Sequence, residues 1–205
     1  PEDVVIITTK SGLIKKVPVS SFKIQHKNTK GIKSNDDILL STIKTNTIDT
    51  LVLFSNKGIM YRILVNNIPD GTNTSKGVPI ASLIKIGNDE QIIAVSSLHR
   101  KTMPKYIIFI TQNGIVKKSF IEEYFKTNRN NGIKALNIQE GDRLVKILFQ
   151  DNEDLLLLSQ KGMSIRFKTS DIGAIGRIAT GIRGMKLNEG DKVIAAMSIH
   201  KETDY

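Results

Sequence analysis

A glycine-centred octet occurs four times in the chain, and this repetition constrains the fold more than any other property of the sequence. The copies are TKSGLIKK at 9–16, SNKGIMYR at 55–62, TQNGIVKK at 111–118 and SQKGMSIR at 159–166. Their glycines, Gly12, Gly58, Gly114 and Gly162, are 46, 56 and 48 residues apart. An interval near fifty residues is typical of architectures in which each repeat is one supersecondary unit.

Each octet has the pattern of a β-hairpin turn. Apolar, β-branched runs such as VVIITT and YIIFI precede the octets, and a glycine at the turn supplies the positive φ that a bulged hairpin needs. A second glycine follows eighteen or nineteen residues later, and Ile or Val always comes after it; these glycines are Gly31, Gly77, Gly132 and Gly181. Another β-rich run closes each repeat, so we expect about four short strands per repeat.

No segment longer than a turn or two has the apolar stripe of a helix. Repeats of about fifty residues with four antiparallel strands predict an all-β, propeller-like fold. We therefore expect a single repeat domain, 1–205, with four blades at approximately 1–48, 49–103, 104–152 and 153–205.

Basic residues recur at one position of the hairpin. Side chains alternate along a strand, so the first and fifth residues after each glycine (Leu13/Val17, Ile59/Ile63, Ile115/Ser119 and Met163/Phe167) are expected to face inward. The fourth residues, Lys16, Arg62, Lys118 and Arg166, are then expected to face outward and to form a basic perimeter. The alternative is that these side chains only protect strand edges from aggregation.

The charge of the chain favours a polyanionic partner or a membrane surface. Thirty Lys and Arg residues stand against twenty Asp and Glu residues, giving a net charge of +10. The segment FKIQHKNTKGIK at 22–33 concentrates four lysines and no acid. Such a loop can bind phosphates, although a solvated lysine-rich turn is the competing interpretation.

Catalytic, metal and membrane signals are missing from the sequence. There is no cysteine, the three histidines have no metal-ligand spacing, and GRIATG at 176–181 lacks the Lys-Ser/Thr of a phosphate-binding loop. We expect no catalytic residue, no metal site, no cofactor and no membrane segment, because the apolar runs are too short to span a bilayer. Trp is absent and no stacking platform is evident, which favours duplex over single-stranded DNA.

The repeats, together with LVLFSNKGIMYR, SKGVPIASL and GRIATGIRGMKL, resemble the C-terminal domain of the A subunit of bacterial type IIA topoisomerases, closest to DNA gyrase. The resemblance covers essentially the whole chain. It implies a β-pinwheel, a disc of blades that exchange strands and wrap DNA at the rim, in a cytoplasmic, nucleoid-associated enzyme. The catalytic tyrosine and the ATPase would lie outside this chain, whose partners would be the ATPase subunit, together with the rest of the A subunit. Whether the four repeats form a complete short disc, part of a larger one or an open crescent stays open.

The gyrase family marks its first blade with a box of the form QRRGGKG. The matching stretch here keeps Gln25, Lys30 and Gly31, and Lys27 preserves a charge. His26 replaces an arginine, while Asn28 and Thr29 replace two glycines. A degenerate box is a feature of topoisomerase IV relatives, whose domain bends DNA with less wrapping, so both family members remain open.

The resulting hypothesis is that duplex DNA runs along a basic edge and is bent or wrapped by backbone contacts, with a protein-interaction scaffold as the alternative of another class. The expected DNA-binding residues are Lys15, Lys16, Lys23, Gln25, His26, Lys27, Asn28, Thr29, Lys30, Gly31, Lys33, Arg62, Lys76, Lys117, Lys118, Lys134, Arg166 and Arg183.

Overall fold

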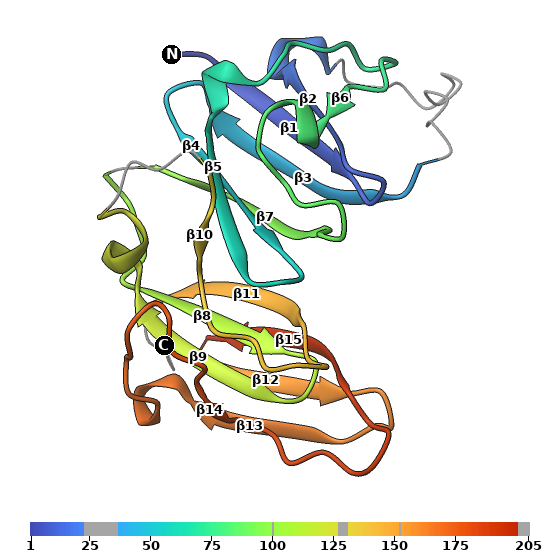
Figure 1. Ribbon diagram of the computed structural model, residues 1–205. Helices are drawn as coiled ribbons and strands as arrows, with labels where there is room; N and C mark the ends of the chain where they lie inside the picture. Colours follow the sequence, from blue (N-terminus) through green and yellow to red (C-terminus); the bar gives the residue numbers. More distant parts are fainter. Residues whose placement is uncertain (23–36, 100, 127–130, 152, 201–205) are drawn as a thin grey trace, which may run out of the picture. The chain divides into compact units, whose positions relative to one another are not determined.

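The computed structural model describes residues 1–22, 37–99, 101–126, 131–151 and 153–200 (Figure 1). The described residues are all-β, as predicted. The strands are β1 (Asp3–Thr9), β2 (Leu13–Pro18), β3 (Leu39–Asn46), β4 (Thr50–Ser55), β5 (Ile59–Leu64), β6 (Val78–Pro79), β7 (Ile92–Leu98), β8 (Tyr106–Thr111), β9 (Ile115–Phe120), β10 (Ile133–Lys134), β11 (Leu144–Gln150), β12 (Asp154–Ser159), β13 (Ser164–Lys168), β14 (Ile182–Arg183) and β15 (Val193–Ile199). Short 3-10 helices follow some strands: η1 (Val19–Ser21), η2 (Val65–Asn67), η3 (Ile80–Ser82), η4 (Ile121–Tyr124) and η5 (Thr169–Asp171).

The four octets form the four predicted hairpin turns. Each opening Ser or Thr accepts two hydrogen bonds: its carbonyl oxygen from the glycine amide, and its hydroxyl oxygen from the amide of the residue after the glycine. In the first turn both distances are 3.1 Å, from Gly12 N to Thr9 O and from Leu13 N to Thr9 Oγ1. The other three turns repeat both bonds. All four glycines have a positive φ, a backbone conformation that residues with a side chain rarely adopt. The Ser/Thr and Gly of the motif are therefore turn residues.

Each hairpin lies in its own antiparallel sheet, and three of the four hairpins receive a short strand from the next repeat. The sheet orders are β3-β1-β2-β6, β10-β5-β4-β7, β11-β8-β9-β14 and β13-β12-β15. The exchanged strands β6, β10 and β14 are the segments that follow the second glycines. In the fourth sheet, no such strand lies beside β13 among the described residues. The expected exchange of strands between blades is thus confirmed.

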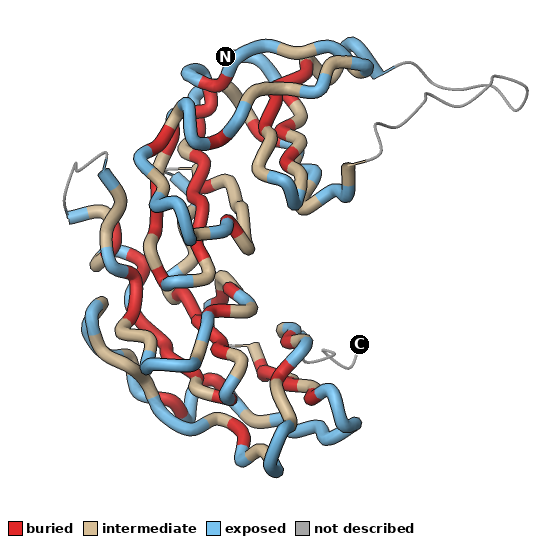
Figure 2. Tube along the Cα trace, turned by 45° about the vertical axis from the view of Figure 1, so that its right-hand side comes forward, coloured by how far each residue is buried: buried red, intermediate tan, exposed pale blue. Residues whose placement is uncertain are grey.

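The chain divides into two compact units, which are described separately. The first comprises Pro1–Phe54, Tyr61–Thr102 and Asn130–Gly132, and the second comprises Ser55–Met60, Met103–Arg129 and Ile133–Tyr205. In both units most of the buried residues lie in the strands, and others lie in 3-10 helices and loops; Figure 2 colours them red along the chain trace. In the second unit, side chains of β8 and β9 pack against those of β12 and β15 to form one apolar cluster. No helix in the described part of the chain is long and apolar enough to cross a membrane.

Candidate nucleic-acid interface

The lysine pairs of the first and third octets are buried. The exposed fractions are 7% for Lys15, 6% for Lys16, 0% for Lys117 and 5% for Lys118. The prediction that Lys16 and Lys118 face outward is therefore wrong. Alternation along a strand gives an exposed face only when nothing covers that face. In the first unit, η2 and the loop at 72–77 of the second repeat cover β2. In the second unit, η5 and the loop at 176–181 of the fourth repeat cover β9. Each of these loops ends at the second glycine of its repeat and is called a second-glycine loop.

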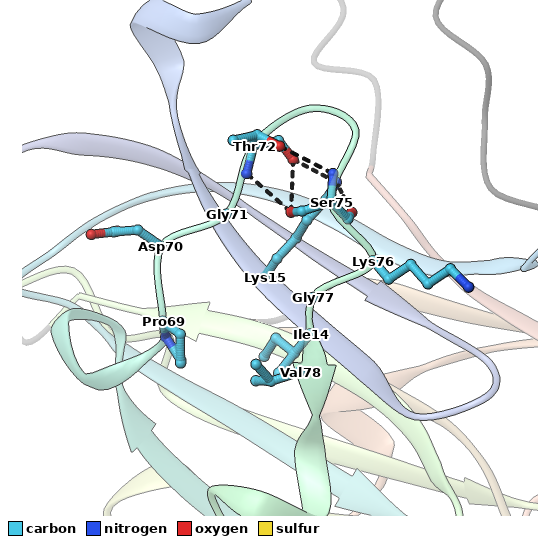
Figure 3. Close-up of a pocket in the computed structure, with 10 residues that line it drawn as sticks. All are labelled: Ile14, Lys15, Pro69, Asp70, Gly71, Thr72, Ser75, Lys76, Gly77 and Val78. Carbon is cyan, nitrogen blue, oxygen red and sulfur yellow. Dashed lines mark hydrogen bonds between the residues drawn. The ribbon is translucent and has the colours of Figure 1, made fainter.

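Lys15 holds the second-glycine loop of the next repeat. Its Nζ donates hydrogen bonds to the carbonyl oxygens of Thr72 at 2.9 Å, Asn73 at 3.1 Å and Ser75 at 2.8 Å. Within the loop, Thr72 and Ser75 exchange hydrogen bonds between backbone and side chain (Figure 3). Burial lowers the pKa of Lys15 from its ordinary value. An ammonium has three hydrogens, so these three carbonyls satisfy it completely.

Lys117 repeats this arrangement in the second unit. Its Nζ donates to the carbonyl oxygens of Ala135 at 2.7 Å, Gly176 at 3.4 Å and Arg177. The rings of Phe109 and Tyr124 have their centroids 5.1 and 5.7 Å from Nζ. Burial lowers the pKa of Lys117 to about 7, and the positive charge of Arg177 adds to the decrease.

The second lysine of each pair holds the other covering element. Lys16 Nζ donates to the carbonyl oxygen of Asn66 in η2 at 3.3 Å and lies 3.3 Å from Asp70 Oδ1. Lys118 Nζ donates to the carbonyl oxygen of Thr169 in η5 at 2.9 Å, and it lies 4.2 Å from the centroid of the Tyr106 ring. Each lysine pair therefore connects one repeat to the next within a single compact unit.

The arginines at the equivalent position are more accessible. Arg166 is exposed, as predicted, and its Nε and Nη2 donate to Asp154 Oδ2 at 3.1 and 3.0 Å. Arg62 is half-buried, and desolvation lowers its pKa. Arg166 is exposed because, among the described residues, no later repeat covers β13.

Four cations lie close to the second glycines and remain accessible. Lys76, Lys134 and Arg183 are exposed, and Arg177 is half-buried. The sequence predicts DNA binding for the first three but not for Arg177, which lies in the GRIATG segment, where the signature of a phosphate-binding loop is missing. The signal that could have found it is its register, four residues before Gly181, where Lys27 precedes Gly31 by the same interval.

Two of these cations lie side by side in the second unit. Arg177 Nη1 donates to the carbonyl oxygen of Lys134, and Lys134 Nζ donates to Asn137 Oδ1 at 2.8 Å. The backbone amide of Asn137 in turn donates to the carbonyl oxygen of Ala179 at 3.1 Å. Lys134 and Arg177 thus form a paired positive surface beside the second glycine of the fourth repeat.

In the first unit, the second-glycine loop bound by Lys15 borders a hollow of about 430 Å³. Its lining residues are Ile14, Lys15, Pro69, Asp70, Gly71, Thr72, Ser75, Lys76, Gly77 and Val78. Figure 3 shows that Lys76 extends away from the loop on the side opposite Asp70, while Lys15 lies beneath the loop. Lys15 of β2 therefore lies under the loop, while Lys76 of the loop extends away from it.

The lysine-rich stretch of the first repeat lies outside the described residues. It contains half of the expected DNA-binding residues: Lys23, Gln25, His26, Lys27, Asn28, Thr29, Lys30, Gly31 and Lys33.

Comparison with known proteins identifies the family. The sequence matches the family described as "DNA gyrase C-terminal domain, beta-propeller" in four segments, residues 3–43, 49–99, 105–151 and 153–200. The chain belongs to this family of gyrase C-terminal domains. It is 31% identical over 208 residues to the A subunit of DNA gyrase from Lawsonia intracellularis, covering 99% of this chain and 25% of that protein. It is 34% identical over 203 residues to the A subunit of DNA gyrase from Staphylococcus epidermidis, covering 95% of this chain and 22% of that protein. The chain thus spans about a quarter of the length of these gyrase proteins.

Solved structures of this gyrase and topoisomerase IV family share the fold. The C-terminal domain of DNA topoisomerase IV superposes with a TM-score of 0.82 at 30% identity, covering 98% of this chain and 62% of that one. The DNA gyrase A C-terminal domain superposes with a TM-score of 0.71 at 27% identity, covering 96% and 65%. Such similar identities do not separate a gyrase domain from a topoisomerase IV domain.

Proposed function

We propose that this domain binds duplex DNA through its phosphates and bends or wraps it. The observation that carries the proposal is the set of accessible cations beside the second glycines: Lys76, Lys134, Arg177 and Arg183. Phosphate contacts made by Lys and Arg provide affinity without reading the base sequence. The net charge of +10 acts in the same direction, because it attracts a polyanion from a distance.

The repetition of these cations suits a curved duplex. Bending 20–30 base pairs by 40–90° costs about 1–6 kcal/mol, so several separated contacts have to exceed this cost together. A single cluster would hold the duplex at one point and leave it straight. Exposed Arg166 and half-buried Arg62 remain in the proposed interface, together with the box residues of the first repeat. The proposed DNA interface excludes four lysines whose ammonium groups are buried and bound to carbonyls, namely Lys15, Lys16, Lys117 and Lys118.

In the whole protein, the domain would serve as the accessory DNA-binding part of a type IIA topoisomerase in the bacterial cytoplasm. It would present a curved DNA segment for ATP-dependent strand passage, with the catalytic tyrosine and the ATPase supplied by other parts of the enzyme. A gyrase would use it to wrap DNA and set the sign of supercoiling. A topoisomerase IV would use it to bend DNA and to select substrates.

A ligation experiment distinguishes these outcomes. Nicked plasmid is saturated with the domain, sealed with ligase and freed of protein, and the change in linking number is measured. A change of one sign that grows with bound protein supports wrapping, whereas tight binding with no change supports bending alone. Absence of salt-sensitive duplex binding would contradict the proposal and favour a protein-interaction scaffold.

A further inference from the structure

The buried lysines Lys15 and Lys117 occupy the same repeat position, three residues after the hairpin glycine. The structure assigns a shared role to them: we propose that they are positioning residues, which orient the second-glycine loop of the following repeat toward DNA phosphates. This inference rests on the proposed DNA binding and concerns how its contact loops are built. Neither lysine touches the DNA itself.

The direction of the loop carbonyls carries the first step. Three carbonyl oxygens, from Thr72, Asn73 and Ser75, point at Lys15 Nζ. A trans peptide places its N–H opposite its C=O, so the next amides along the chain, those of Asn73, Thr74 and Lys76, point away from the lysine. Within the described part of the chain, none of these three amides has a protein acceptor.

Outward amides and an outward cation make a phosphate-binding surface. The Lys76 side chain extends from the same loop that presents the three amides (Figure 3). Backbone N–H groups together with an ammonium are the donors that commonly hold a phosphodiester. In the second unit, Lys117 draws the carbonyls of Gly176 and Arg177 inward, so the amides of Arg177 and Ile178 point outward beside the Arg177 side chain.

The loop is also fixed at its end. A Cβ placed on Gly77 would lie 2.5 Å from the carbonyl oxygen of Ile14, and a Cβ on Gly181 would lie 2.6 Å from that of Val116. Ile14 and Val116 immediately precede Lys15 and Lys117 on the same strands. Each loop is therefore anchored to one strand at two points, by an ammonium and by a close backbone approach.

The carbonyl oxygens around each buried Nζ fit lysine better than arginine. Three acceptors converge on one nitrogen, which matches a compact ammonium with three donors. A guanidinium is larger and planar, and it spreads its donors over a fork. Lys117 has no exposed surface and its Nζ lies against the rings of Phe109 and Tyr124, so the site leaves little room for that fork. An arginine at either position would keep the charge and displace the loop.

This difference gives a test based on charge-conserving variants. The folded domain carrying Lys15→Arg, Lys76→Met, Lys85→Arg or both Lys15→Arg and Lys76→Met is titrated with a short linear duplex over a series of salt concentrations. We expect Lys76→Met to weaken binding about three- to tenfold and to reduce the salt slope by about one. Lys15→Arg should do the same although it removes no charge. The double variant should be little worse than Lys76→Met. The matched control Lys85→Arg, at an exposed lysine of the same unit outside the proposed contacts, should bind like the parent.

Hydrogen exchange of residues 72–76 provides a readout that requires no DNA. We expect the Ser75 amide, which bonds within the loop, to exchange faster in Lys15→Arg and in the shorter, neutral Lys15→Gln. If Lys15→Arg keeps parental affinity, salt slope and loop exchange, the positioning role is wrong. If Lys76→Met leaves DNA binding unchanged while loop exchange still responds to Lys15, the proposed interface is wrong and only the loop anchoring stands. If Lys15→Arg fails to fold, Lys15→Gln and Lys117→Arg decide by the same criteria.

Discussion

At the scale of single residues, two glycines determine how closely consecutive repeats approach. Gly77 and Gly181 have φ values of +85° and +106°, and each lies against the backbone of a strand from the preceding repeat. A side chain would strain the backbone and also collide with a carbonyl oxygen that cannot move away easily. These glycines are therefore required both by conformation and by space.

We expect Gly181→Ala to lower the free energy of unfolding by about 1–3 kcal/mol. The measurement is the urea midpoint at constant slope. Gly173→Ala is the matched control, because a Cβ there meets no atom within 4 Å and the residue has no positive φ. The control should change stability by less than about 0.5 kcal/mol. Equal effects of the two substitutions would contradict the close approach.

Lys117 predicts a pH dependence of stability. Its pKa is about 7 in the folded chain against an ordinary value of 10.5, so between these values the unfolded chain binds more protons at this group. The free energy of unfolding should then rise with pH across this window. The groups facing Lys117 are the Arg177 guanidinium and Tyr124, whose pKa burial raises. Tyr124 therefore stays neutral between pH 7 and 9.

We therefore expect denaturant midpoints to increase from pH 7 to pH 9 more in the parent than in Lys117→Met. The substitution removes the titrating group while keeping an unbranched side chain of similar length. Parallel pH profiles for the two proteins would show that Lys117 keeps its proton throughout this range.

At the scale of elements, the hairpin strands show what sequence can and cannot predict. The turns at Gly12 and Gly114 follow from local chemistry, because glycine and a preceding Thr are sufficient to specify them. The orientation of Lys16 and Lys118 does not follow from local chemistry. Both faces of β2 and β9 are covered by elements about fifty residues further along the chain. Period-two alternation assumes one open face, and only the structure shows which strands have it.

The same contrast predicts unequal effects at equivalent positions. Lys118→Met should destabilise the domain by about 1–3 kcal/mol, since it leaves the Thr169 carbonyl oxygen without the donor that it has now. Arg166→Met should cost less, about 1 kcal/mol, because the Arg166 side chain is 52% exposed and water reaches the pair from the arginine side, while the Asp154 side chain is only 10% exposed. Thermal or urea unfolding of both variants measures the two losses of stability and tests this difference. A larger loss for Arg166→Met would mean that the buried lysines contribute little to the junction between repeats.

At the scale of the whole molecule, the family and the all-β fold were predictable from the repeat, because four copies of one pattern reinforce each other. The exposure of the cations predicted to bind DNA followed from the sequence only in part. Lys76, Lys134 and Arg183 are exposed, while the lysine pairs of the first and third octets hold the repeats together. Composition indicates how much charge a surface can carry, but packing decides which cations remain on it.

The central claim is that duplex DNA contacts the cations beside the second glycines, and the salt dependence of affinity tests it most directly. A variant with Lys76, Lys134, Arg177 and Arg183 all changed to Ala should lose about 0.9 of log-log slope per lost phosphate contact, or about 3–4 in total. The matched control changes four exposed lysines elsewhere to Ala, namely Lys10, Lys85, Lys146 and Lys168, with the same loss of charge. The account predicts a nearly parental slope for the control. Equal slopes for the two variants would contradict it.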